Sequence, residues 1–209
     1  MDAERALAVG YAPPAAQPGV AALLALDRRL GGIVRRASEP TIGLMRLTWW
    51  GDALAALDTG PPPAEPLLQA LAAAGVPGAP LGEMIEGWAV LLDGDAIDPT
   101  ALERFAQERG ARLFGALDRV LGASDERIGA LGEGWALADL AMHMSDAAVV
   151  AAARSMAVER LDRCFGARWP KDLRVLGALG LLARSDLAGG TPGSPARVAR
   201  LMIHRLTGR

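Results

Sequence analysis

Apolar residues recur every three or four positions along most of this chain, and that spacing constrains the fold more than any other feature. The first clear series is Leu23, Leu26, Leu30, Ile33 and Val34, which share one face of a helix. No run alternates apolar and polar residues between turn signals, as a half-buried strand requires. Alanine and leucine supply most of the 51% hydrophobic content, and both favour helices. The sequence therefore predicts an all-α protein.

Proline and glycine mark the expected helix boundaries. A short N-terminal helix should precede a loop at 13–19. After this loop, one helix should end near residues 38–40, and a second long helix should end before residue 60. Further helices are expected over 66–74, 81–92, 98–121, 124–165 (as two helices or one kinked helix), 171–183 and 195–206. The second long helix should bury Ile42, Met45, Trp49 and Ala53 on one face. The connections are too short to be domain linkers, which predicts a single domain over residues 1–209.

Charge and cysteine content exclude several classes of function. The net charge of −2 gives no basic field for nucleic acid, so none is expected as a partner. Cys164 is the sole cysteine, which rules out an internal disulfide and fits a reducing cytoplasm. The start Met1-Asp2-Ala3-Glu4-Arg5 lacks the cationic region of a signal peptide, and prolines interrupt the charge-free stretch 6–26. We expect a cytoplasmic protein, with peripheral contact at the inner membrane left open by its apolar composition.

The best local candidate for a metal site is Asp139, His143 and Asp146. At positions i, i+4 and i+7 of one helix they would share a face, and all three residue types ligate metals. The alternative is a polar stripe beside an apolar helix face, because no second histidine or acidic pair completes a ligand shell. No phosphate-binding glycine loop, nucleophile elbow, HExxH or CxxC motif is present.

The dipeptide Trp49-Trp50 is the most distinctive candidate for recognition. Adjacent helical residues point about 100° apart, so one ring can enter the core while the other reaches a groove or partner. The periodicity assigns Trp49 to the core and Trp50 to recognition; burial of both rings is the alternative. Arg46, one turn before Trp50, can stack on that ring or pair with Asp52.

Several segments resemble the squalene/phytoene synthase family in order and spacing. They are Leu23–Asp27 through Val34, Glu39-Pro40, Leu44–Trp50 with Leu54, Gly94–Asp98, Phe105–Ala111, Gly134–Ala136, Pro170–Arg174 and Arg184–Leu187. The resemblance spans about residues 23–187, and Phe105 lies where members usually place a tyrosine. It implies a helical bundle of the trans-isoprenyl diphosphate synthase type.

That family condenses two prenyl diphosphates head to head and binds Mg²⁺ and the diphosphates through two aspartate-rich motifs on facing helices. Mg²⁺ requires such hard carboxylate ligands to neutralise a diphosphate leaving group. In this chain the first motif falls on Gly31, Gly32 and Arg35, which cannot bind a cation. The second leaves only Asp146, without a carboxylate one turn away.

The resemblance therefore implies a non-catalytic member, similar to the branch that includes the respiratory complex I assembly factor, here in a bacterial relative. Arg46, Trp49, Trp50 and Phe105 are the candidate residues for binding a protein partner or an apolar, prenyl-like ligand. No cofactor is expected. Two alternatives remain: a condensing enzyme with a remodelled site, which would need Mg²⁺, and a lipid or prenyl-chain carrier.

Overall fold

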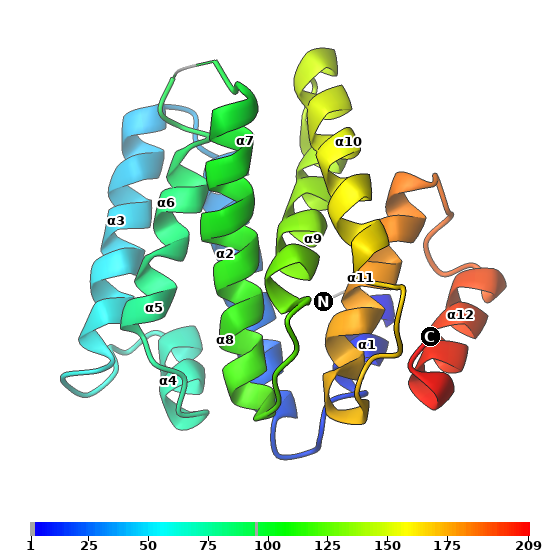
Figure 1. Cartoon of the computed structure of the whole chain (residues 1–209). Helices are drawn as coiled ribbons and strands as arrows, with labels where there is room; N and C mark the ends of the chain where they lie inside the picture. Colours follow the sequence, from blue (N-terminus) through cyan, green and yellow to red (C-terminus); the bar gives the residue numbers. More distant parts are fainter. Residues whose placement is uncertain (1–2, 95) are drawn as a thin grey trace.

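The computed structural model describes residues 3–94 and 96–209, so Met1 and Asp2, on which the signal-peptide argument partly rests, lie outside it. Within the described residues all regular structure is helical (Figure 1), which confirms the all-α prediction. The elements are α1 (Ala3–Val9), α2 (Gln17–Arg35), α3 (Pro40–Ala56), α4 (Pro66–Ala73), α5 (Ala79–Gly82), α6 (Met84–Ala89), α7 (Pro99–Phe105), the π-helical segment η1 (Ala106–Ala111), α8 (Arg112–Leu121), α9 (Ile128–His143), α10 (Ala147–Arg163), the 3₁₀ turn η2 (Lys171–Leu173), α11 (Arg174–Leu187) and α12 (Pro195–Thr207). None of the described helices is both long and apolar enough to cross a membrane.

Local sequence explains most of the boundaries. Asp98 accepts a hydrogen bond from the Ala101 backbone N–H at the start of α7, and Gly122, at φ 67°, ends α8. The loop expected at 13–19 is shorter than predicted, because Pro18 lies in the first turn of α2, where its missing N–H costs nothing. The segment 124–165 forms two helices, and the Asp146 side chain caps the second.

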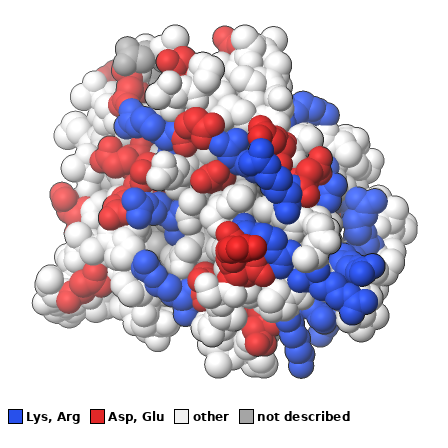
Figure 2. Space-filling model, in the orientation of Figure 1, with Lys and Arg blue, Asp and Glu red and all other residues white. Residues whose placement is uncertain are grey.

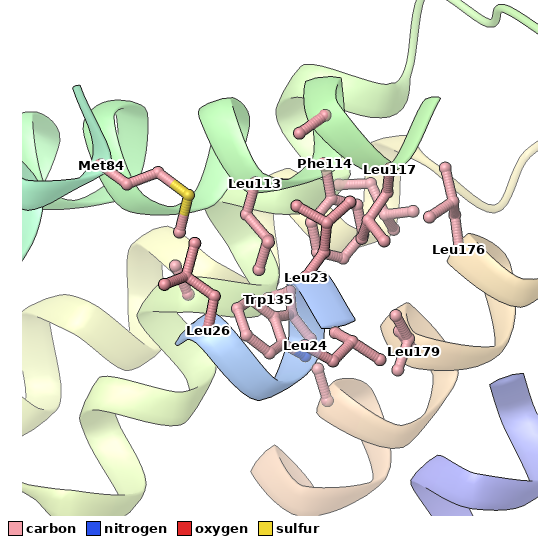
Figure 3. Packing of buried hydrophobic residues seen from close by; sticks show 14 of the residues in the cluster. Leu23, Leu24, Leu26, Met84, Leu113, Phe114, Leu117, Trp135, Leu176 and Leu179 are labelled. Carbon is pink, nitrogen blue, oxygen red and sulfur yellow. The ribbon is translucent and has the colours of Figure 1, made fainter. Parts of the chain in front are cut away.

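The helices lie side by side around a shared apolar core (Figures 1 and 3). The core-lining helix α9 packs against α8, α10, α11 and η1, while α2 contacts α3, α4, α6 and α8. Figure 3 shows side chains of Leu23, Leu26, Leu113, Phe114 and Trp135 meeting between α2, α8 and α9. Burial of these apolar surfaces is the main force that holds the bundle together.

Glycines bring three backbones close together beside this core. A Cβ on Gly110 of η1 would lie 2.3 Å from the carbonyl oxygen of Gly132 in α9. A Cβ on Gly87 of α6 would lie 2.6 Å from the backbone nitrogen of Arg109. Any larger residue at these positions would push η1 away from α6 and α9. The glycines thus fix the π-helical segment between two neighbours.

Helix α3 faces the core with a different side from the one predicted. Trp50 is 5% exposed and Trp49 is 50% exposed, and Ile42 and Met45 also face solvent. The predicted assignment of the two tryptophans was therefore wrong. The apolar residues of α3 are spread over most of its circumference, so its periodicity does not determine which face is buried. Contacts with α2, α5 and α6 determine that face.

We predict that Trp50→Ala lowers the free energy of unfolding by about 3–5 kcal/mol, because it removes a buried aromatic ring and leaves a cavity. Trp49→Ala should cost less than about 1 kcal/mol, because that ring is half exposed and loses mainly its edge contact with Trp50. Denaturant titration followed by circular dichroism measures both values. Equal losses in the two variants would contradict the orientation of α3.

Candidate functional site

The interior of the bundle holds a buried ionic cluster made of one arginine and two aspartates. Arg109 of η1 is 2% exposed. Its Nε and Nη2 donate to the two carboxylate oxygens of Asp27 in α2, over 2.8 and 2.9 Å. Nη2 also donates to Oδ2 of Asp139 in α9, over 2.7 Å. One guanidinium therefore links α2, η1 and α9 through charge-assisted hydrogen bonds.

Three aromatic rings surround the same guanidinium. The Cζ atom of Arg109 lies 4.0 Å from the ring centroid of Trp88, 4.9 Å from that of Trp135 and 5.3 Å from that of Phe105. Trp88 and Phe105 contact each other edge to face. Desolvated cation–π contacts of this kind stabilise a buried cation. Phe105 is completely buried, so its side chain cannot contact a partner at the surface, as the sequence had suggested.

Arg109 and Asp139 stabilise each other's charged forms. Burial acts to lower the pKa of Arg109, but attraction to Asp27 and Asp139 outweighs it, and the net shift is upward. For Asp139, burial acts to raise the pKa, and the Arg109 guanidinium holds it below its ordinary value. Arg5 of α1 and His143 add further nitrogen atoms 3.7 and 3.6 Å from Asp139 Oδ1. Arg109 and Asp139 are thus ionised at neutral pH.

The positions of the first expected acidic motif begin one turn beyond Asp27 in α2. A Cβ on Gly31 would come 2.7 Å from the Trp88 ring, so this glycine makes room for the indole. A Cβ on Gly32 would meet the guanidinium of Arg36 at 2.8 Å. Arg35 is exposed at the end of α2. No carboxylate occupies these positions, and Trp88 fills the space beside the first of them.

The metal site suggested for Asp139, His143 and Asp146 does not form. α9 ends at His143, and Asp146 accepts hydrogen bonds from the backbone N–H groups of Ala148 and Val149 at the start of α10. His143 instead places Nδ1 2.7 Å from the Asp139 carbonyl oxygen. Among residues 3–94 and 96–209, no group of three or more His, Cys, Asp or Glu side chains could hold a metal ion.

The interior carboxylates do not fit a magnesium cluster. Asp27 uses both of its oxygens for Arg109, and Asp139 uses one. A divalent cation would have to displace a guanidinium that is itself held by three aromatic rings. The cation that balances these carboxylates is therefore part of the chain.

A second feature lies on the outside of α2. Arg29, Arg36, Arg46, Trp49 and Trp50 line an open groove of about 270 Å³ between α2 and α3. Arg29, and not Arg46 as predicted, lies over the Trp50 ring, 5.5 Å from its centroid. Within the described part of the chain, Arg46 pairs neither with Asp52 nor with another carboxylate within 4 Å.

The all-α bundle has the architecture of an isoprenoid synthase-type fold. The family model for squalene/phytoene synthase matches residues 1–163, which are 163 of the 209 residues, and the chain belongs to this family. The match ends with α10, so the C-terminal part of the resemblance, at 170–187, lies beyond it. No curated protein and no solved structure matches the chain.

Sequence reasoning missed Asp27 and Arg109 and placed Asp139 in a different cluster. A signal was present: each charge interrupts a buried apolar stripe. Asp27 follows Leu23 by four positions, Arg109 follows Phe105 by four, and Asp139 follows Trp135 by four. Charged residues are almost never buried unless they are paired, so three charges on core-facing positions indicate that they pair with one another.

We predict that Arg109→Met lowers the free energy of unfolding by about 3–5 kcal/mol, because buried Asp27 loses its cation and partly buried Asp139 keeps only the more distant Arg5. Adding Asp27→Asn and Asp139→Asn to this variant should recover much of the loss. Arg104→Met, at an exposed arginine of the neighbouring helix α7, is the control and should change stability by less than about 0.5 kcal/mol. Urea titrations measure all three variants. If the single and triple variants were equally unstable, the charge imbalance would not be the cause.

The pH dependence of stability should report Asp139. Its pKa is lower in the folded state than in the unfolded state, so the ionised form adds stability above the unfolded-state value of about 3.9. That contribution should disappear as the pH falls through the lower folded-state pKa. We therefore expect the stability difference between wild type and Asp139→Asn to be constant near neutral pH and to shrink below pH ~4. A difference that grows on acidification would contradict this assignment.

Proposed function

We propose that this protein is a non-catalytic member of the squalene/phytoene synthase family that uses its helical shell as a binding or assembly factor. The observation that carries the proposal is the buried Arg109 between Asp27 and Asp139. The family chemistry inferred above needs facing carboxylates that bind Mg²⁺ and a diphosphate. Here the facing carboxylates neutralise a side chain of the same protein.

The electrostatics of the interior support this proposal. Stabilising the charge that develops on a departing group is usually the largest contribution to catalysis. The Arg109 guanidinium is already committed to two carboxylates and three rings, so it offers little to an incoming diphosphate. A synthase would also need space for two substrates where Trp88, Phe105 and Trp135 are packed.

The same packing argues against a prenyl-chain carrier with its ligand between the helices. Such a carrier needs an apolar cavity, and the space between α2, α6, η1 and α9 is occupied by buried side chains. A remodelled condensing enzyme would have to open this region. The assembly role follows the resemblance to the respiratory complex I assembly factor and is the more specific part of the proposal.

We predict that purified protein releases no pyrophosphate from farnesyl or geranylgeranyl diphosphate with Mg²⁺. The variant Gly31→Asp/Gly32→Asp/Arg35→Asp should also remain inactive, because the second motif is absent and an aspartate at position 31 would collide with Trp88. A pyrophosphate assay with an active family member as positive control measures both. Mg²⁺-dependent release by the wild-type protein would refute the non-catalytic proposal.

The assembly role has a separate test. Deleting the gene in the source organism should reduce the amount of assembled respiratory complex I on native gels stained for NADH oxidation. Wild-type protein should restore the complex, and so should Arg104→Met, whereas the destabilised Arg109→Met should not. Normal assembly in the deletion strain would exclude this role and leave a binding function for another partner.

A further inference from the structure

We propose that the groove between α2 and α3, with the outer face of α3, docks the protein onto a membrane surface rich in anionic phospholipids. The lining of the groove includes Arg29, Arg36, Arg46, Trp49 and Trp50. The proposal goes beyond the function proposed above, since it holds whether or not the interior is catalytic.

The first observation is an unbalanced positive charge. The lining of the groove contains three arginines and no carboxylate. Arg29 has an acidic partner, Glu65, at 3.4 Å. Within residues 3–94 and 96–209, Arg36 and Arg46 have no carboxylate within 4 Å. Two guanidinium groups are therefore free to bind oxygen anions, and phosphate is a preferred partner of the guanidinium fork.

The second observation is the apolar character of the neighbouring surface. Ile42, Met45 and Trp49 follow one another at i, i+3 and i+7 on α3, and all three are exposed, Met45 to 68%. α3 forms one edge of the bundle in Figure 1. Exposed apolar side chains beside arginines combine the two contributions to peripheral membrane binding, which are burial of apolar area and attraction to anionic lipids.

Trp49 fits this location by its own chemistry. Tryptophan gathers at membrane interfaces because its ring is apolar while its N–H remains hydrated. The Trp49 ring packs edge to face on buried Trp50, with centroids 5.4 Å apart, which holds it in place at the surface. Arg36 and Arg46 can extend their aliphatic stems along this apolar surface while their charged ends reach phosphates.

Charge complementarity favours a lipid surface over a protein partner. The arginines line a groove beside the exposed side chains of Ile42, Met45 and Trp49, and a membrane offers many phosphates next to an apolar layer. Each arginine near an anionic membrane strengthens binding about fivefold, so losing two should weaken it about 30-fold.

The experiment uses the full chain and two vesicle compositions: phosphatidylcholine alone, and phosphatidylcholine with phosphatidylglycerol. We expect co-sedimentation with the anionic vesicles only. Arg36→Gln/Arg46→Gln should weaken it by about 30-fold without lowering the melting temperature, because both side chains are exposed and unpaired. Lys and Arg also gather at the edge near α12 (Figure 2), so Arg200→Gln and Leu206→Ala on α12 are matched controls that should bind normally.

Intrinsic fluorescence gives an independent readout. The other four tryptophans, Trp50, Trp88, Trp135 and Trp169, are buried, so lipids with brominated acyl chains should selectively quench Trp49. Trp49→Phe should still bind but lose this quenching. Failure to bind anionic vesicles, equal binding to neutral ones, or weakening by the α12 variants alone would overturn the proposal.

A soluble anion is tested separately by calorimetric titration with inorganic pyrophosphate. We expect no saturable binding. Saturable binding that Arg36→Gln/Arg46→Gln abolishes would assign the groove to a soluble phosphate compound and overturn the membrane proposal.

Discussion

A guanidinium group enclosed by two carboxylates and three aromatic rings sets the spacing of the central helices. Arginine does not lose its proton in a protein, so burial of Arg109 cannot be relieved by neutralisation, as burial of a lysine can. The buried guanidinium must instead pair with the carboxylates of Asp27 and Asp139. These hydrogen bonds hold α2 and α9 close to η1. Gly87 and Gly110 make this arrangement possible, because their lack of a side chain allows the backbone of η1 to approach α6 and α9.

The internal cation also bears on function. A metal bound by facing carboxylates can be exchanged and can bring a phosphate with it, because its remaining coordination positions accept further oxygens. A guanidinium is covalently fixed, carries a single charge and here faces aromatic surfaces. The guanidinium links the facing helices by charge without offering open coordination positions to a further ligand. This is the physical basis for proposing that the family shell has been retained without its chemistry.

Helical periodicity and proline positions were sufficient to predict the all-α fold and most helix boundaries, because both act within a few residues. The orientation of α3 could not be predicted, since apolar side chains surround it and the buried face depends on distant helices. The ionic cluster was missed because Asp27 and Arg109 are 82 positions apart, and no local pattern pairs them. The break between α9 and α10 separated Asp146 from Asp139, and with it the suggested metal site.

Helix α2 connects the interior cluster with the outer groove. Asp27 and Gly31 face the interior, while Gly32 and Arg36 line the groove. The neighbouring residues Gly31 and Gly32 therefore lie on different sides of the helix. The last turn of a helix carries a partial negative charge, which makes carboxylates unfavourable there and arginines favourable by about 0.3–1 kcal/mol each. An acidic motif at this helix end would need a bound cation to offset its own charge. With Arg109 as the interior cation, glycine at position 31 leaves room for the Trp88 ring, and the arginine at the end of α2 complements the helix dipole.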